Sequence, residues 1–540
     1  MSHHTKPSVF LNDVSFSWPD GDAVFSGITA TFGTGRTGLI GTNGAGKTTL
    51  LRLITRELTP TSGSIASSGD IGYLPQKLIL EKEATAASLL GIEGKLMALK
   101  AIESGDVSSS HFDTIGDDWD IESSARALLD GIGLNSISLD RTVGTLSGGE
   151  SMLVALAGLE MAGMSVILLD EPTNNLDRES RRRLYEVIES WPGALIVVSH
   201  DVALLNLMDE TAELHAGGLT VYGGGYHGFQ EYRAKEQVAA QQALRNAQQT
   251  LKMEQKQRVE AETKLARRGR YAQTAYENKR EPRAVMKLRK RDAQVSAGRL
   301  RGGMDDDVET ARQLVEVKEA LVRKESQIII DLPDPLVPGG RILAEFRNPD
   351  GQLFQIRGPE RVALTGRNGI GKTRLLERLL QHSSTREFSP QSRIDTKLQT
   401  ELVGYLPQRD DYLDDDATIL EFVSAAAPTV SMNEVRSRLA RFLFRADAVR
   451  RRVGDLSGGE RFRVALAALL LAEPPNQLLI LDEPTNNLDL SSVDELVSAL
   501  SSYRGGLLVV SHDDEFLTRL NLGTWLELGI AGLVRLEREM

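Results

Sequence analysis

Residues 41–48 read Gly-Thr-Asn-Gly-Ala-Gly-Lys-Thr, and residues 366–373 read Gly-Arg-Asn-Gly-Ile-Gly-Lys-Thr. Both fit the pattern G-x-x-x-x-G-K-[ST], and each follows a short apolar run that is typical of a buried strand. In such a loop the glycines let successive backbone N–H groups converge on phosphate oxygens at a helix N-terminus. One match can arise by chance, but two in the same context predict two phosphate-binding loops.

Other short motifs recur in the same order in both halves of the 540-residue chain, and the aliphatic runs before them recur as well. The distance from the first copy to the second is 312 residues both for Asp170 and for His200, as a rigid core requires. Between Gln76 and Ser147 the first copy is 22 residues longer than the second, so we expect an insertion within about 77–145. Aliphatic runs that alternate with helical segments predict parallel strands covered on both faces. The sequence therefore predicts an α/β fold with two P-loop ATPase domains.

Ionisable residues follow the aliphatic strands of each repeat. An Asp-Glu pair ends one strand, and a histidine ends another strand 29 residues after the glutamate. The Asp, the P-loop Thr and a Gln are suited to hold Mg²⁺, and the Glu is placed to polarise an attacking water. The predicted metal ligands are Thr48, Gln76, Asp170, Thr373, Gln408 and Asp482. The predicted catalytic residues are Glu171, His200, Glu483 and His512.

The loops supply most of the predicted nucleotide contacts. In the first repeat these residues are Gly41, Asn43, Gly44, Gly46, Lys47, Thr48, Thr49 and Gln76. In the second they are Gly366, Asn368, Gly369, Gly371, Lys372, Thr373, Arg374 and Gln408. A Leu-Ser-Gly-Gly-Glu motif at 146–150 and again at 456–460 opens a further helix and forms another anion-binding N-terminus. Its predicted ligands are Ser147, Gly148, Gly149, Ser457, Gly458 and Gly459. Since each repeat already has a P-loop for its own ATP, we expect these residues to contact an ATP that is bound elsewhere.

The stretch between the repeats, 229–328, matches neither of them. From 264 to 301 it contains 13 Lys or Arg and three acids, a charge of +10, whereas the whole chain carries −12. Apolar residues at helical spacing, with Ala240, Leu244 and Ala247 on one segment and Val308 and Ala311 on the return, predict an antiparallel helical hairpin.

Glycines interrupt the helical pattern at 269, 298, 302 and 303, and so does Pro282, so we expect the tip of the hairpin between about 269 and 303. Basic residues there suit RNA phosphates, and Tyr271 and Tyr276 suit base stacking. The predicted RNA-binding residues are Arg270, Arg283, Lys287, Arg289, Lys290 and Arg291. The alternative is a solvated coiled-coil spacer whose charge only maintains solubility.

Composition excludes several classes of protein. The chain has no cysteine, which excludes disulfides and thiol catalysis. No apolar run approaches the ~20 residues needed to span a bilayer, and residues 1–7 lack the apolar region of a signal peptide. We therefore expect a cytoplasmic protein without stable membrane insertion.

Together these motifs resemble the ATP-binding cassette superfamily, whose signature is Leu-Ser-Gly-Gly-Glu. Two cassettes on one chain, a charged helical linker and the run Asp-Glu-Pro-Thr-Asn-Asn-Leu-Asp resemble the ABC-F family within it. The resemblance implies a cassette at 1–228, a hairpin linker at 229–328 and a second cassette at 329–540 in a monomer. It also implies two ATPs with Mg²⁺ held head to tail between the cassettes, with Ser457 and Gly459 completing the first site and Ser147 and Gly149 the second.

The resemblance further implies that Asp177 and Asp489 lie across the interface and that Trp18 stacks on adenine. The counterpart of Trp18 is Asn348, which cannot stack, although Phe346 or Phe354 is available nearby. Leu153 stands where the family usually has an Arg, as the second repeat does at Arg463. Because all the chemical groups occur twice, we expect both sites to hydrolyse ATP.

ABC-F proteins bind the ribosome near the exit site and extend the linker toward the peptidyl-transferase centre. The resemblance therefore implies the ribosome as partner, through rRNA and the P-site tRNA, either in translation or in protection from antibiotics. The long hairpin and modest insertion favour protection. Two alternatives stay open: an ATPase subunit recruited to a separate membrane exporter, and a cassette ATPase that acts on DNA.

Overall fold

The computed structural model describes residues 8–76, 83–174, 176–277, 283–322, 332–381, 394–408, 412–486 and 488–537. The chain divides into two compact units. One unit comprises Met1–Tyr226 and Gln327–Met540 and contains both repeats, and the other comprises His227–Ser326.

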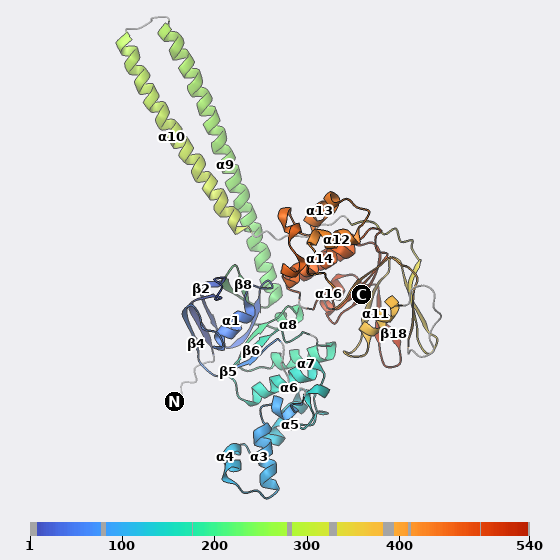
Figure 1. The fold of residues 1–540 in the computed structure, drawn as a ribbon. Helices are drawn as coiled ribbons and strands as arrows, with labels where there is room; N and C mark the ends of the chain where they lie inside the picture. Colours follow the sequence, from blue (N-terminus) through green and yellow to red (C-terminus); the bar gives the residue numbers. More distant parts are fainter. Residues whose placement is uncertain are drawn as a thin grey trace. The chain divides into compact units, whose positions relative to one another are not determined.

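The first repeat holds a six-stranded sheet in the order β5-β6-β7-β3-β8-β9 and a three-stranded antiparallel sheet in the order β2-β1-β4 (Figure 1). Its strands are β1 Val9–Ser17, β2 Ala23–Phe32, β3 Gly35–Ile40, β4 Ser62–Ser67, β5 Ile71–Leu74, β6 Val166–Asp170, β7 Ala194–Val198, β8 Glu210–His215 and β9 Gly218–Gly223. Its helices are α1 Lys47–Ile54, α2 Ala86–Leu89, α3 Glu93–Glu103, α4 Ser109–Ile115, α5 Ile121–Gly131, η1 Val143–Thr145, α6 Gly148–Met161, α7 Arg178–Glu189 and α8 Val202–Asn206.

The second repeat has the same sheets, in the orders β14-β15-β16-β12-β17-β18 and β11-β10-β13. Its strands are β10 Ile342–Arg347, β11 Leu353–Arg357, β12 Arg361–Thr365, β13 Asp395–Leu398, β14 Val403–Leu406, β15 Leu478–Asp482, β16 Gly506–Val510, β17 Thr524–Leu528 and β18 Leu533–Leu536. Its helices are α11 Lys372–Gln381, α12 Ile419–Ala426, α13 Met432–Arg441, η2 Ala446–Arg450, η3 Val453–Asp455, α14 Gly458–Leu470, α15 Leu490–Ser502 and α16 Asp514–Arg519. The predicted α/β fold with two P-loop modules is confirmed.

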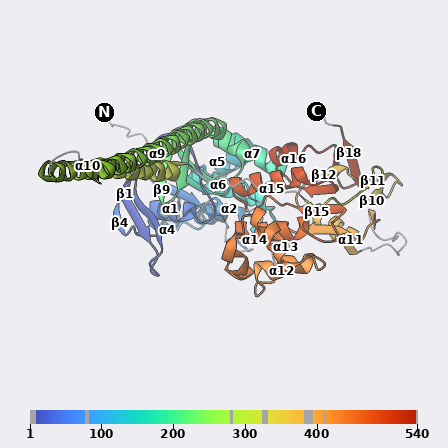
Figure 2. The ribbon, with the colours of Figure 1, turned by 90° about the horizontal axis from the view of Figure 1, so that it is seen from above.

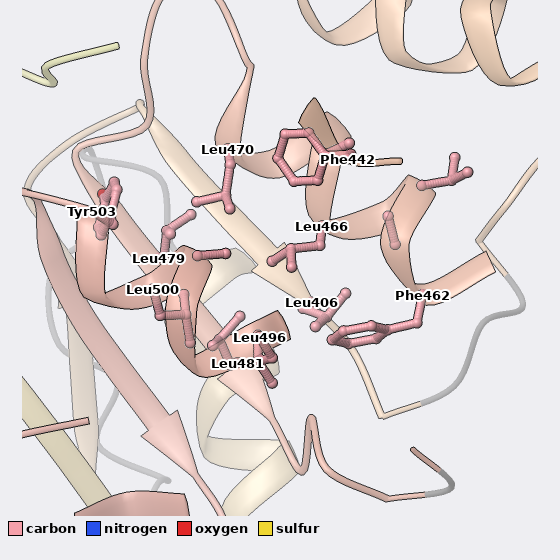
Figure 3. Packing of buried hydrophobic residues seen from close by; sticks show 14 of the residues in the cluster. Leu406, Phe442, Phe462, Leu466, Leu470, Leu479, Leu481, Leu496, Leu500 and Tyr503 are labelled. Carbon is pink, nitrogen blue, oxygen red and sulfur yellow. The ribbon is translucent and has the colours of Figure 1, made fainter. Parts of the chain in front are cut away.

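The central strands are buried on both faces, which explains their continuous aliphatic sequence. Along β15 the side chains alternate between two cores: Leu479 and Leu481 pack in one, and Leu478 and Ile480 pack in the other. Figure 3 shows Leu479 and Leu481 facing leucines of α14 and α15. The strand therefore cannot tolerate a polar residue before Asp482, where it ends.

The order of the strands in the sheet brings the repeated motifs together within each repeat. Strands β3, β7 and β6 are parallel neighbours, as are β12, β16 and β15. The carboxyl ends of parallel strands lie at one edge of the sheet, where ligands of such folds bind. The P-loop, the Asp-Glu pair and the histidine each follow one of these strands.

The longer segment of the first repeat, within 77–145, holds the helices α2 to α5 in its described part. The corresponding described part of the second repeat holds α12 and α13. An aromatic pair, Phe112 with Trp119, packs between α4 and α5 at 5.8 Å between ring centroids, and both rings are partly exposed. The helices of this segment otherwise pack in the core of the cassette, where Leu96, Ile121 and Leu129 belong to the same cluster as Leu156 of α6.

The unit between the repeats is a pair of long helices, α9 Tyr226–Glu277 and α10 Arg283–Leu321. At 1.5 Å per residue the 52-residue α9 is about 78 Å long. The two helices lie side by side in Figures 1 and 2, and Arg258 Nε contacts Asp305 Oδ1 at 2.8 Å between them. Ala247 and Ala311 are buried, so the predicted apolar seam and hairpin are confirmed.

The predicted extent of the tip is wrong. Helix α9 continues through Gly269 and α10 through Gly298, Gly302 and Gly303, whereas Pro282 lies outside the described residues. A glycine costs a helix only about 1 kcal/mol relative to alanine, and the flanking Ala, Gln, Lys and Arg favour helix. The two helices therefore reach Glu277 and Arg283, and most of the basic residues lie on helix rather than loop.

Candidate functional site

Both P-loops have the backbone that their glycines predict. In the first, Gly44 and Gly46 have φ of 81° and 99°, and in the second Gly369 and Gly371 have φ of 75° and 104°. These angles are in the left-handed region, which other residues rarely adopt. A Cβ on Gly46 would also lie 2.5 Å from Val24 Cγ1.

The P-loop lysines curl back over their loops. Lys47 Nζ donates to the Gly41 carbonyl at 2.7 Å, and Lys372 Nζ donates to the Gly366 carbonyl at 2.8 Å. Burial lowers the pKa of both lysines, although neighbouring carboxylates oppose the shift. Each ammonium is therefore held where phosphate oxygens approach the loop.

The aspartates that end β6 and β15 are buried. The Thr48 hydroxyl donates to Asp170 Oδ2 at 2.8 Å, and the Tyr73 hydroxyl lies 3.4 Å from the same oxygen. In the second repeat, neither carboxylate oxygen of Asp482 has a well-formed hydrogen bond among the described residues. Burial raises the pKa of both aspartates, and the adjacent threonine hydroxyls oppose this. A buried carboxylate beside a threonine hydroxyl is a donor set that Mg²⁺ prefers.

Each glutamate that follows these aspartates adopts a left-handed backbone, with φ of 52° for Glu171 and 48° for Glu483. The strain is maintained by a hydrogen bond from the glutamate N–H to the neighbouring strand, at 2.8 Å to Val198 and to Val510. This conformation turns the side chain toward the histidine that follows that strand.

The glutamate–histidine pairs differ between the repeats. His200 Nε2 lies 3.1 Å from Glu171 Oε1. His512 Nε2 lies 3.4 Å from Glu483 Oε1 but 2.7 Å from Lys372 Nζ. Burial raises the pKa of Glu171 to about 8 and of Glu483 to about 7. Burial and the nearby lysine lower the pKa of both histidines to about 3, so both are neutral near pH 7.

The two repeats also touch directly through residues that cap helices. Asp489, the N-cap of α15, accepts a hydrogen bond of 2.8 Å from the Asn43 N–H in the first P-loop. Asp177, the N-cap of α7, accepts one of 3.4 Å from the Asn368 N–H in the second. The expectation that both aspartates lie across the interface is confirmed.

The serines of the signature motifs are N-caps as well. Ser147 accepts from the Glu150 N–H at 3.1 Å, and Ser457 accepts from the Glu460 N–H at 3.4 Å. Both serines are exposed, as are Gly148 and Gly458, whereas Gly149 and Gly459 are buried. The N-termini of α6 and α14 are therefore accessible at the surface beside these serines.

A cavity surrounds the second P-loop. Its described lining consists of Leu176, Arg181, Asn368, Gly369, Gly371, Lys372, Thr373, Arg374, Gln408, Asp482, Glu483, Asn486 and His512. Nearly all of the predicted site residues of the second repeat are therefore brought together. Ser147 and Gly149 are not among the described residues that line it. In the first repeat, Gln76 is exposed just after β5 and Thr49 is half-buried on α1.

Comparison with known proteins agrees with this arrangement. The family model described as ABC transporter matches residues 26–174 and 350–486, together more than half of the chain. The chain belongs to the ATP-binding cassette family. Its tandem cassettes and its relatives are of the ABC-F type, and it is an ATPase.

Two relatives align with this ABC-F protein over nearly their whole lengths. The tylosin resistance ATP-binding protein TlrC of Streptomyces fradiae is 31% identical and aligns over 91% of this chain and 92% of its own. An uncharacterized ABC transporter ATP-binding protein of Bacillus subtilis (strain 168), YfmM, is 30% identical over 97% of this chain and 96% of its own. The solved structure of an RNase-L Inhibitor shares the fold at a TM-score of 0.54 and 18% identity, covering 96% of this chain and 88% of that one. In the part of the ABC-F chain that the structure describes, no helix is long and apolar enough to cross a membrane.

The region that was expected to contact adenine differs between the two cassettes. Trp18 follows β1, is 38% exposed and packs edge-to-face on Phe16 at 5.1 Å between ring centroids. Asn348 is instead buried and bonded to the backbone of Leu533, through its Nδ2 to the carbonyl and its Oδ1 to the N–H, both at 2.8 Å. Asn348 is therefore a structural residue.

The two phenylalanines considered as replacements for Trp18 in the second cassette both pack against its core. Phe346 is buried at 1% exposure in the core, so it is unavailable for stacking. Phe354 is half-buried against the same core. Trp18 consequently has no exposed aromatic counterpart among these candidates.

Sequence reasoning missed Arg181, which lies on α7 of the first cassette but lines the cavity of the second. The sequence shows a difference between the repeats at this position, but not the contact itself. Three arginines follow Asp177 at 181–183, while Val-Asp-Glu follows Asp489 at 493–495.

Proposed function

We propose that this ATPase binds the ribosome near the exit site, closes its two cassettes on ATP, and uses the basic hairpin to act on the P-site tRNA and the rRNA of the peptidyl-transferase centre. The result is protection from antibiotics or regulation of translation, in the cytoplasm where ribosomes reside. Hydrolysis reopens the cassettes, a population shift driven by the nucleotide.

Each residue of the ATP sites has a role in this proposal. The P-loop residues bind phosphates, and Ser457 with Gly459 and Ser147 with Gly149 reach the ATP of the opposite cassette when the cassettes close. Mg²⁺ would be held by Thr48, Gln76 and Asp170 in one site and by Thr373, Gln408 and Asp482 in the other. When bound, it neutralises charge on the phosphate oxygens.

The glutamates are the bases of the reaction in this proposal. A carboxylate whose pKa is raised toward 7 accepts a proton from water more effectively than an ordinary glutamate. The neutral histidine beside it keeps the glutamate side chain oriented. Since Glu171 and Glu483 both have this setting, both sites are competent for hydrolysis.

The observation that carries the ribosome proposal is the hairpin. Residues 264–301 carry a charge of +10, and the parts of this stretch on α9 and α10 carry +9 of it. Arg270, Arg291 and Tyr271 are exposed there, the tyrosine at 79%. Cations along a narrow helical pair suit RNA phosphates, and an exposed tyrosine suits base stacking. The name of TlrC ties a full-length relative to resistance against tylosin.

Sedimentation with ribosomes tests the proposal. The double variant E171Q/E483Q retains ATP because its bases are gone, and it should pellet with ribosomes in ATP but not in ADP. Native membranes from the same cells are the second arm. If the ATP-bound variant remains in the supernatant with ribosomes and is retained by membranes, the protein is an exporter ATPase and the proposal is wrong.

A further inference from the structure

Arg181 belongs to the first cassette but contacts the second. It lies on α7 four residues after Asp177, and its Nη1 donates to the His512 carbonyl at 3.3 Å. Its side chain is only 14% exposed. Its Nε is buried and has no acceptor among the described residues. A guanidinium from one cassette thus lies in the ATP cavity of the other.

The residue that Arg181 contacts, His512, is also hydrogen-bonded to the proposed base, Glu483. The His512 N–H donates to Glu483 Oε2 at 3.3 Å, so the peptide groups on both sides of this histidine are held. Arg181 is anchored in its own cassette by Asp201, 3.7 Å away, which in turn accepts from the Tyr185 hydroxyl at 2.5 Å. A chain of contacts therefore runs from Tyr185 to Glu483 across the interface.

A second arginine reinforces the contact. Arg178, at the start of α7, pairs with Asp514 at the start of α16. The charged groups that face this region from all sides are Lys372, Asp482 and Glu483 of the second site, Asp513 and Asp514 after His512, and Asp177, Arg178, Arg181 and Asp201 of the first cassette. The arginines are the cations that the first cassette adds.

The equivalent residue of the second cassette, Val493, cannot make such a contact with the first ATP site. Val493 lies four residues after Asp489, is 8% exposed and packs in the core of its own cassette. Leu490 stands opposite Arg178 in the repeat. The main charges that act on Glu171 are Lys47, Asp170 and Asp201, and none of them is a guanidinium from the second cassette.

We propose that Arg181 is a positioning residue that the first cassette supplies to the second ATP site, and that the first site works without a counterpart. The inference rests on the proposed roles of Glu171 and Glu483. Because Arg181 reaches His512 only through the interface, the second site is complete only when the cassettes are joined.

Single-base variants isolate the two sites for the test, without ribosomes. In E171Q only the second site turns over, and there R181Q should lower kcat about tenfold, the loss expected for one hydrogen bond to the backbone, with a smaller change in KM. R181K should recover part of the rate. In E483Q, R181Q should leave kcat unchanged within about twofold.

R182Q is the matched control, since Arg182 lies on the same helix, is 72% exposed and contacts only Glu186 among the described ion pairs. It should alter neither background. If R181Q lowers kcat equally in both backgrounds, or in neither, the proposal is overturned.

Should the coupling of the sites leave both single-base variants inactive, photolabelling with γ-labelled azido-ATP decides. After cleavage within the hairpin, R181Q should retain unhydrolysed label in the second cassette only, and equal retention in both cassettes would overturn the proposal. If E171Q/E483Q hydrolyses ATP at the native rate, the site assignment itself is wrong, which is a separate result.

Discussion

Asp489 accepts a hydrogen bond of 2.8 Å from the Asn43 N–H, so the cap of a helix in one cassette holds the P-loop of the other, 446 residues away in the chain. The reciprocal bond, from the Asn368 N–H to Asp177, is 3.4 Å. A charge-assisted hydrogen bond weakens as it lengthens. The two P-loops are therefore held unequally across one interface.

Replacing these aspartates should reveal the inequality. Both D489A and D177A remove a helix cap, which costs about 0.5–2 kcal/mol of stability in either case. D489A removes in addition the shorter contact to a P-loop, so we expect it to lower kcat/KM for ATP by about tenfold more than D177A. Steady-state ATPase assays on the two variants make the comparison, and an equal or reversed loss would contradict it.

The pH dependence of turnover should differ between the sites. A general base works only when deprotonated, so activity is lost as the pH falls through the raised pKa of the glutamate. In E171Q the acid limb of kcat/KM should have its midpoint near pH 7, set by Glu483, and in E483Q near pH 8, set by Glu171. The histidines do not contribute, because their pKa of about 3 keeps them neutral in this range. Identical profiles would show that the two bases share one environment.

Introducing the family arginine at Leu153 should destabilise the first cassette. Leu153 is 1% exposed in the core beside α7, and Arg183 occupies the position that Glu495 has in the second cassette. There Arg463 pairs with Glu495 at 3.4 Å. L153R would bury a charge without a partner, at a cost of about 3–5 kcal/mol of unfolding free energy.

The double variant L153R/R183E supplies the missing carboxylate and should regain part of that stability. Chemical denaturation of the two single variants and the double variant forms a cycle that measures the coupling. Strictly additive effects would mean that the two positions do not interact.

The glycines of α10 should lower the stability of this helix, and no close packing contact requires a glycine at these positions. A Cβ on Gly298, Gly302 or Gly303 would meet no atom within 4 Å among the described residues. G302A/G303A should therefore slow amide hydrogen exchange along α10, since each change favours helix by about 0.5–1 kcal/mol. The contrasting variant is G38A, whose Cβ would lie 2.7 Å from Leu205 Cδ2 and should destabilise the first cassette. Unchanged exchange in G302A/G303A would contradict the account.

The sequence was sufficient where a motif carries its own geometry. The P-loop glycines specify left-handed backbone, and the aliphatic runs before Asp170 and Asp482 specify buried strands, so the α/β fold and the grouping of the second site followed directly. The hairpin glycines misled, because helix propensity is a small local term that long flanking segments override.

The contact that Arg181 makes across the interface was out of reach for a different reason. Arg181 and Val493 occupy equivalent positions, yet only packing shows that one crosses to the other cassette and the other stays in its own core. Asn348 likewise appeared as a failed adenine contact, whereas its amide closes two backbone bonds to Leu533. Such roles depend on which surfaces meet, which local sequence does not encode.

We propose above that the basic hairpin links the cassette ATPase to the ribosome. The most direct test of this link is the ratio of ribosome-stimulated to basal ATPase activity in R289Q/K290Q/R291Q, a variant of α10. The control is K252Q/K256Q, which neutralises two exposed lysines on α9. We expect the first variant to lose stimulation and keep basal turnover, while the control keeps both. Full stimulation in R289Q/K290Q/R291Q, or equal loss in the control, would contradict it.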